Sequence, residues 1–199
     1  MGFSAACERN KGALLDQLAL YFGAFRRVLE VGGGTGQHAV HFASHLAHLV
    51  WQTTEQPARL AALQARVTAE GPANLLPAIA LDVEDRDWPR ADFDAVFTAN
   101  TLHILSWPQV EHCFAGVSRT LDVGGVFGVY GPFRRHGHTH ESNERFDAEL
   151  KSRDPASGIR DLDDLEAFGT RVGLNLVADV LMPANNQLLI WRRVDVPAG

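Results

Sequence analysis

Residues 28–38 read Val-Leu-Glu-Val-Gly-Gly-Gly-Thr-Gly-Gln-His, a short apolar run that ends in a glycine-rich turn. The residues that follow have a helical pattern, with Ala39, Phe42 and Ala43 on its buried side. A strand, a tight turn and a helix in this order direct backbone N–H groups and a helix N-terminus at a nucleotide-type ligand. Glycine suits such a turn because it has no Cβ to obstruct a ligand and adopts positive φ angles freely. The stretch therefore predicts a nucleotide-type site after the first strand.

The spacing of the glycines distinguishes two kinds of ligand. Glu30 precedes Gly32, and further glycines stand at Gly34 and Gly36, which gives the pattern E-x-G-x-G-x-G. A dinucleotide fingerprint requires its third glycine one position later, where this chain has Gln37. The mismatch favours S-adenosylmethionine (SAM), which has no pyrophosphate, over NAD.

The composition is typical of one globular domain. The chain has 199 residues, of which 46% are apolar and 21% are charged, so we expect a single domain over residues 1–199. A formal charge of −6 and the lack of a long basic run argue against a nucleic-acid partner. No apolar run approaches the length of a membrane span, and the N-terminus does not resemble a signal peptide. We expect a cytoplasmic protein with a small-molecule substrate and no membrane or nucleic-acid partner; the sequence indicates no oligomeric state.

Strand and helix patterns alternate along the chain. An N-terminal helix, expected at about residues 8–22 as a cap, precedes the first strand. The expected strands cover residues 27–31, 49–54, 75–81, 93–98, 126–130, 174–181 and 187–194, and the expected helices include 35–48, 58–70, 108–121, 142–151 and one capped by Asp161. The last two strands have so short a connection that they must be antiparallel. The pattern predicts a Rossmann-like α/β fold, with a mostly parallel seven-stranded sheet, a C-terminal antiparallel hairpin and helices on both faces.

Polar residues at the ends of the strands are the candidates for ligand binding, because open α/β sheets bind ligands at the carboxyl ends of their strands. Glu55 follows the second strand, where an acid accepts hydrogen bonds from ribose hydroxyls. Asp82, followed by Val83, ends the third strand, where a carboxylate can bind the exocyclic amine of adenine. Each acid could singly be a cap or turn residue, but an acid at each of the first three strand ends is less expected by chance. The next two strand ends contribute Asn100, His103 and Tyr130.

The chain resembles class I SAM-dependent methyltransferases, and more closely a domain-of-unknown-function family that includes methyltransferase-like protein twenty-six. The resemblance rests on residues 8–11, 34–42, 51–52, 81–83, 130–133, 158–161 and 182–186. It implies the class I fold, with SAM as cofactor and S-adenosylhomocysteine (SAH) as product, and it does not define a methyl acceptor. The chain departs from the family at Glu55, where Asp is usual, and at Gly32-Gly33, where Ala-Ser is more usual. The longer acid should still reach a ribose.

The predicted cofactor site comprises Arg9, Asn10, Glu30, Gly32, Gly34, Gly36, His38, Glu55, Asp82, Val83 and Asn100. Arg9 or Lys11 would bind the methionine carboxylate of SAM if the N-terminal helix folds over the site. Methyl transfer needs mainly alignment of the nucleophile with the methyl group, which can supply roughly 7–11 kcal/mol.

The catalytic candidates are His103, as a general base for an acceptor that carries a proton, and Tyr130, which would orient or polarise the acceptor. Each has a structural alternative, as a packed loop histidine or an aromatic lid over the core. The expected wall of the acceptor site consists of Phe133, Asn143, Asp147, Arg160, Asn185 and Asn186.

Two histidine clusters are the main competing feature. His38, His41, His45 and His48 share one face of the expected helix, and His136, His138 and His140 form an H-x-H-x-H run. No acid or cysteine completes a recognised zinc spacing, so we predict no metal site.

The function that these observations favour is SAM-dependent methyl transfer to an N, O or S nucleophile of a small molecule. The alternative is a non-catalytic SAM- or nucleotide-binding regulatory module. An NAD-dependent oxidoreductase is disfavoured by Gln37 and by the C-terminal hairpin.

Overall fold

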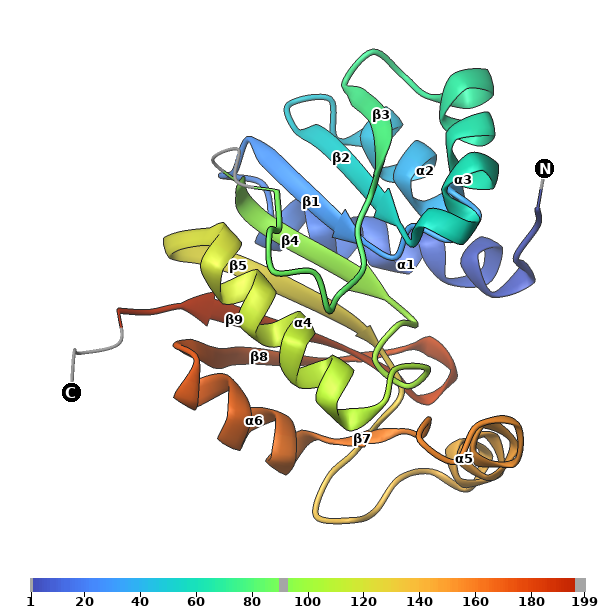
Figure 1. Cartoon of the computed structure of the whole chain (residues 1–199), viewed down its shortest axis with the longest axis vertical. Helices are drawn as coiled ribbons and strands as arrows, with labels where there is room; N and C mark the ends of the chain where they lie inside the picture. The colour runs from blue at the N-terminus through green and yellow to red at the C-terminus, as the bar shows by residue number, and fades with distance from the viewer. Residues whose placement is uncertain (1, 90–92, 196–199) are drawn as a thin grey trace.

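The computed structural model describes residues 2–89 and 93–195. Its main sheet has seven strands in the order β3-β2-β1-β4-β5-β9-β8. These are β1 (Arg27–Val31), β2 (Val50–Glu55), β3 (Leu75–Ala80), β4 (Phe93–Ala99), β5 (Leu121–Gly131), β8 (Leu174–Met182) and β9 (Asn186–Arg193). The first five strands pair in parallel, whereas β9 pairs antiparallel with both β5 and β8 (Figure 1). The predicted sheet and its C-terminal hairpin are confirmed.

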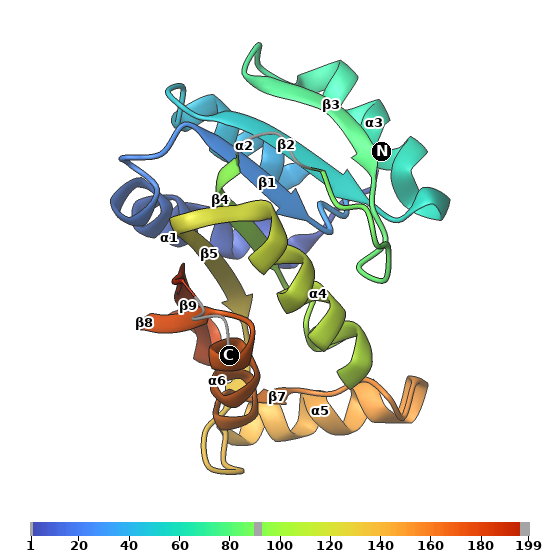
Figure 2. The same ribbon diagram turned by 60° about the vertical axis from the view of Figure 1, so that its left-hand side comes forward.

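Helices cover both faces of the sheet, also as predicted. One face carries α1 (Ala5–Tyr21), α2 (Gln37–His45) and α3 (Pro57–Glu70), and the other carries α4 (Trp107–Thr120) and α6 (Leu162–Arg171). Successive residues of β1 serve opposite faces, so Val28 packs with the α1–α3 layer and Leu29 with the α4–α6 layer. The remaining helix, α5 (Glu141–Arg153), lies outside the two layers, beside β7 (Arg160–Asp161) (Figures 1 and 2).

Local chemistry explains where several helices begin. The side chain of Ser4 accepts a hydrogen bond from the Cys7 amide, so α1 begins at Ala5, earlier than expected. Ser106 and Gln109 form a capping box at the start of α4. The predicted cap of α6 is confirmed, because the Asp161 side chain accepts from the Asp163 amide.

Three boundaries differ from the expectation. Helix α2 begins at Gln37, after Gly36 with its left-handed φ of 76°. It ends at His45, where Leu46 leaves the helical conformation, so His48 lies beyond the helix. Strand β5 begins at Leu121, and the expected turn at 122–125 is a bulge between the pairs Phe93–Leu121 and Ala95–Val126. A short parallel pair of β6 (Phe133–Arg134) with β7 was not predicted. The end of the expected loop 84–92, at residues 90–92, lies outside the described residues.

The hairpin of β8 and β9 turns through a short 3-10 helix, η1 (Pro183–Asn185). Ala184 and Asn185 adopt left-handed φ angles there, which brings this turn back to the carboxyl end of β5. Within residues 2–89 and 93–195, no helix combines the length and apolar character needed to cross a bilayer.

Candidate functional site

The glycine turn after β1 is fastened to the end of β2. Gly32 and Gly34 have φ angles of 71° and 57°, which confirms the expected left-handed turn. The Gly33 amide donates to the Thr54 carbonyl at 2.8 Å, and the Gly34 amide donates to Glu55 Oε2 at 2.8 Å. The second carboxylate oxygen, Glu55 Oε1, accepts from the Gln56 amide. The turn and the acid that follows β2 therefore form one unit.

Glu30 lies beneath this turn. It is 2% exposed, and its Oε2 accepts a hydrogen bond from Trp51 Nε1 at 3.1 Å. Burial raises the pKa of Glu30 to about 7, against the opposing effect of the hydrogen bond from Trp51. A Cβ on Gly33 would lie 3.4 Å from Glu30 Oε2 and only 2.2 Å from Thr53 Oγ1. Glu30 thus supports the turn from below, and Gly33 is needed for the close approach.

A cavity of about 470 Å³, called here the glycine-turn cavity, opens above the turn. Of the predicted cofactor residues, it is lined by Gly32, Gly34, Glu55, Val83 and Asn100. Its volume falls in the range of small-molecule and cofactor sites. Asp82 lies next to it, and its carboxylate accepts hydrogen bonds from Gln56 Nε2 and the Glu84 amide.

Sequence reasoning missed the rest of this lining. The additional residues are Val31, Gln56, Arg59, Leu81, Ala99, Thr101, Ile104, Leu105 and Gln109. Most of them lie between a strand end and the helix that follows it. Their closeness to the predicted strand ends in the sequence could therefore have identified them as lining residues. Ile104, which is 47% exposed, is an apolar side chain at the mouth of this cavity.

A second cavity of about 370 Å³, the histidine cavity, lies on the other side of the turn, and its lining includes His38, His103, Cys7, Thr35, Asn100 and Phe146. His38 is 5% exposed, and its Nε2 lies 2.7 Å from Asn10 Oδ1. Burial lowers the pKa of His38 to about 4, so its ring is neutral at pH 7. Gly36, another predicted cofactor residue, has a packing role instead. A Cβ at Gly36 would lie 2.9 Å from Leu63, so this glycine lets α2 pack against α3.

His103 lies in this cavity but is a weak base. It is 7% exposed and packs edge-on against Phe146 at a centroid distance of 5.2 Å. Burial, with a smaller contribution from the charge of Arg160, lowers the pKa of His103 to about 4. An efficient general base has a pKa near the working pH, so this environment suits a neutral packed histidine better than a base.

A third cavity of about 390 Å³, the tyrosine cavity, brings three distant parts of the chain together. It is lined by Ala6, Arg9, Asn10, Asn100, Tyr130, Pro183, Ala184 and Asn186. Burial raises the pKa of Tyr130, and Asn10 and Asn186 partly oppose this rise, as they lie beside its hydroxyl. The N-terminal helix therefore does reach over the strand ends, and it carries Arg9 and Asn10 to Tyr130.

The predicted acceptor wall divides into two groups. Phe133, Asn143, Asn185 and Asn186 line a fourth cavity of about 500 Å³, the outer cavity, which adjoins the tyrosine cavity at Asn186. Its lining also includes Arg135, His138, His140 and Asp179, which were not predicted as site residues. Asn143 Nδ2 donates to the Asn185 carbonyl at 2.9 Å, which ties α5 to the hairpin turn.

Asp147 and Arg160 form the second group, and their side chains are engaged within the protein. Asp147 accepts hydrogen bonds from Arg134 at 2.8 Å, Lys151 at 2.7 Å and the Ile159 amide at 2.7 Å. Arg160 donates to the carbonyls of Leu102, Leu105 and Ala156. These bonds hold α5 and the segment after it against the loop that follows β4.

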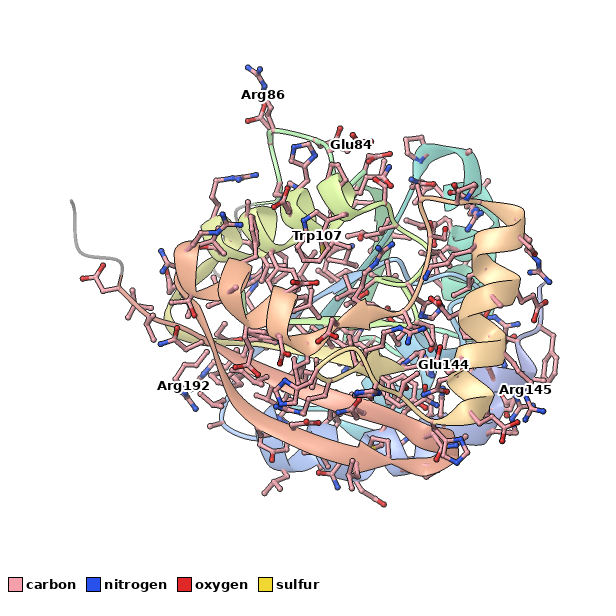
Figure 3. The ribbon with its side chains drawn as sticks, turned by 90° about the horizontal axis from the view of Figure 1, so that it is seen from below. Glu84, Arg86, Trp107, Glu144, Arg145 and Arg192 are labelled. Carbon is pink, nitrogen blue, oxygen red and sulfur yellow. The ribbon has the colours of Figure 1, made fainter. Side chains whose placement is uncertain are left out.

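Helix α5 carries charged side chains on both its sides. Arg134 also pairs with Glu144 at 2.6 Å. Figure 3 shows Glu144 on the side of α5 that faces the rest of the molecule and Arg145 on its outer side. The outward residue is 74% exposed, so the inner side of α5 is the one that contributes to the site.

The histidine clusters have other roles. His136 Nδ1 lies 2.6 Å from Asp163 Oδ2, and His45 Nδ1 lies 2.7 Å from the His41 carbonyl. In the part of the chain that the structure describes, no three His, Cys, Asp or Glu side chains are grouped to hold a metal ion.

Several solved structures have the same fold. SibL, an S-adenosylmethionine-dependent methyltransferase solved in its apo form, superposes with a TM-score of 0.81 at 23% identity, over 96% of this chain and 56% of SibL. An O-methyltransferase family protein from Burkholderia thailandensis gives 0.80 at 15% identity, over 93% of this chain and 56% of that protein. An O-methyltransferase family 2 protein from Planctomyces limnophilus DSM 3776, in complex with apigenin, gives 0.79 at 17% identity, with the same coverage of 93% and 56%.

The chain thus spans little more than half the length of these proteins, and at these identities the likeness shows the fold alone. The fold is that of SAM-dependent methyltransferases, as the sequence predicts. A protein-family profile described as "Protein of unknown function (DUF938)" matches residues 1–193. The chain belongs to this family.

Proposed function

We propose that this protein is a SAM-dependent methyltransferase that methylates an N, O or S nucleophile of a small-molecule acceptor and releases SAH. The observation that carries the proposal is the position of Asn100, which lines the glycine-turn, histidine and tyrosine cavities together. A cofactor bound along the first two cavities would therefore meet an acceptor in the third at this residue. The proposal includes a cytoplasmic location and kinship with methyltransferase-like protein twenty-six.

The donor set fits SAM. In the glycine-turn cavity, Glu55 would bind the ribose hydroxyls, and Leu81 and Val83 would pack against the adenine ring. The adjacent Asp82 would take the exocyclic amine. The methionine portion would lie in the histidine cavity, along the Gly33–Thr35 backbone. Bound SAM supplies an electrophilic methyl group on a positively charged sulfur.

The protein's contribution to the reaction is alignment. The Asn100 amide donates to the Tyr130 carbonyl at 2.8 Å, which fixes the ends of β4 and β5 where the cavities meet. The raised pKa of Tyr130 keeps its phenol protonated, so it donates a hydrogen bond to the acceptor. Because His103 is a weak base, the acceptor's nucleophile reacts with a lone pair that is already free, and any proton leaves to water afterwards.

Calorimetric titration tests the cofactor. Wild type, Glu55→Ala and Glu55→Gln are titrated with SAM, SAH and NAD, and Glu141→Ala on the outside of α5 serves as the control. We expect micromolar binding of SAM and SAH, weakened about a hundredfold by Glu55→Ala through loss of two charge-assisted hydrogen bonds. Glu55→Gln keeps an oxygen for the Gly34 amide, so it separates ligand contact from damage to the turn. Binding of NAD without SAH would refute the proposal.

The second candidate is a SAM-binding regulatory module without turnover. The low pKa of His103 favours this candidate, because the predicted general base is a weak one. Production of SAH from SAM with any small acceptor, abolished together with SAH binding in Glu55→Ala, would exclude it.

A further inference from the structure

We propose that the methyl acceptor is a small carboxylic acid, and that Arg9 binds its carboxylate in the tyrosine cavity. The inference rests on the proposed function, because it assigns a substrate class to the same site. It differs from the sequence-based expectation, in which Arg9 binds the carboxylate of the cofactor itself.

The tyrosine cavity has a positive, donor-rich lining. Among the described residues, that lining consists of one cation, three amides, one phenol, two alanines and a proline. Two of the three neighbouring cavities differ in this respect, because the glycine-turn cavity contains Glu55 and the outer cavity contains Asp179. The third, the histidine cavity, has neither an acid nor a guanidinium among its described lining residues. A cavity with a guanidinium and no acid in its lining selects an anion.

Arg9 is available for a ligand. Its helix neighbours are engaged with each other, since Lys11 Nζ lies 2.5 Å from Glu8 Oε2. Glu8 Oε1 also accepts from Gln37 Nε2 at 2.7 Å. Within residues 2–89 and 93–195, Arg9 makes no ion pair and no side-chain hydrogen bond. Arg9 is an exposed residue of the cavity lining, and its guanidinium donors are free.

Asn10 and Tyr130 add donors beside it. Asn10 is 7% exposed, and its Oδ1 accepts from His38 Nε2, so its amide N–H groups are left for the cavity. The phenol of Tyr130 keeps its proton. Asn186 directs its own amide N–H groups at the Pro183 and Ala184 carbonyls. Arg9, Asn10 and Tyr130 thus contribute donors to the lining of one cavity, which suits the two oxygens of a carboxylate.

The cofactor's own carboxylate is the competing source of the same chemistry. The glycine turn, along which the methionine portion would lie, lines the glycine-turn and histidine cavities. The tyrosine cavity is lined instead by α1, the loop after β4, the end of β5 and η1. The free guanidinium therefore lies on the acceptor side of Asn100.

The transfer balances with such an acceptor. Arg9 holds the carboxylate, and a second group of the acid, an amine, hydroxyl or thiol, faces Asn100. Its lone pair forms the new bond to the methyl carbon, while the sulfur–methyl bond breaks and leaves its electron pair on sulfur as neutral SAH. The proton of the methylated group passes to water.

The first arm of the test identifies which carboxylate Arg9 binds. Wild type, Arg9→Ala and Lys11→Ala are titrated with SAH and with 5′-methylthioadenosine, which lacks the amino-acid portion. We expect Arg9→Ala to bind both ligands within twofold of wild type. A tenfold loss for SAH alone would assign Arg9 to the cofactor and overturn the inference. Failure of wild type to bind SAH would refute the proposed function instead, so the two failures are distinguishable.

The second arm measures the preference for a carboxylate. Acetate, acetamide, benzoate and benzamide are titrated into the wild-type complex with SAH and followed by ligand-observed NMR. We expect the acids to bind and the amides not to, with binding weakened about tenfold or more by Arg9→Ala and unchanged by Lys11→Ala. Equal binding of acids and amides, no binding of either acid, or indifference to Arg9→Ala would each overturn the inference.

Discussion

The glycine-turn cavity and the tyrosine cavity lie side by side, yet they are built differently. The first is formed by successive strand ends and is fixed by hydrogen bonds of backbone amides, from Gly33 to the Thr54 carbonyl and from Gly34 to the Glu55 carboxylate. The second combines α1, the end of β5 and the hairpin turn, and side-chain contacts such as that between Asn10 and His38 hold it. The proposed cofactor side is therefore specified by local sequence, and the proposed acceptor side by packing between distant segments.

The largest expected effect comes from Gly33→Ala, which disturbs the glycine turn of the proposed cofactor side. The new Cβ would lie 2.2 Å from Thr53 Oγ1, and overpacking of this kind costs about 1–3 kcal/mol or more. We expect that loss in the free energy of unfolding by denaturant, and at least tenfold weaker SAH binding because the turn must shift.

Two variants control this prediction. Gly12→Ala has no atom within 4 Å of its new Cβ and lies inside α1, so it should stabilise the protein by up to about 1 kcal/mol. Adding Thr53→Ala to Gly33→Ala removes the obstructing oxygen and should restore part of the SAH affinity. If the double variant binds no better than Gly33→Ala, the close contact is not the cause.

Glu30→Gln tests the support beneath the turn through its pH dependence. Because burial raises the folded-state pKa from its ordinary 4.5 to about 7, the folded protein holds the proton more tightly than the unfolded chain. The associated stability is complete below pH 4.5 and is lost as the pH rises through 7. We expect Glu30→Gln to gain on the order of 3 kcal/mol relative to wild type between pH 4.5 and 8. Denaturant unfolding at several pH values measures this difference, and a constant difference would contradict the raised pKa.

Five of the predicted cofactor residues line the glycine-turn cavity, because their positions at strand ends depend on local rules. The apolar run before the glycines marks a buried strand, and the acids at the first three strand ends come together because those ends meet at one edge of the sheet. Glu30 shows the limit of those rules. Neighbouring residues of a strand face opposite sides, so Val31 lines the glycine-turn cavity whereas the buried Glu30 supports the turn from below. The tyrosine cavity depends on where α1 packs and on the left-handed turn at Ala184 and Asn185. No local pattern places Ala6 or Arg9 next to Tyr130.

Asp147→Asn tests whether Asp147 has a structural role or forms part of the acceptor site. The neutral amide loses its charge-assisted bonds to Arg134 and Lys151, each worth about 1.5–3 kcal/mol before relaxation. We expect a loss of about 2 kcal/mol in the free energy of unfolding, with SAH affinity within twofold of wild type. Glu149→Gln, a surface control on the same helix, should cost less than about 0.5 kcal/mol. Unchanged stability with tenfold weaker benzoate binding would return Asp147 to the acceptor site.

The smallest expected effect concerns His103, at the boundary between the two sides. Its folded-state pKa of about 4 lies below the ordinary 6.5, so its neutral form contributes stability above pH 6.5 that is lost as the pH falls toward 4. We expect the ring C–H signals of His103, assigned with His103→Gln, to stay constant from pH 8 to about 5.5. A midpoint near 6.5 for His103 would restore it as a general base, and the acceptor side would then supply proton transfer as well as alignment.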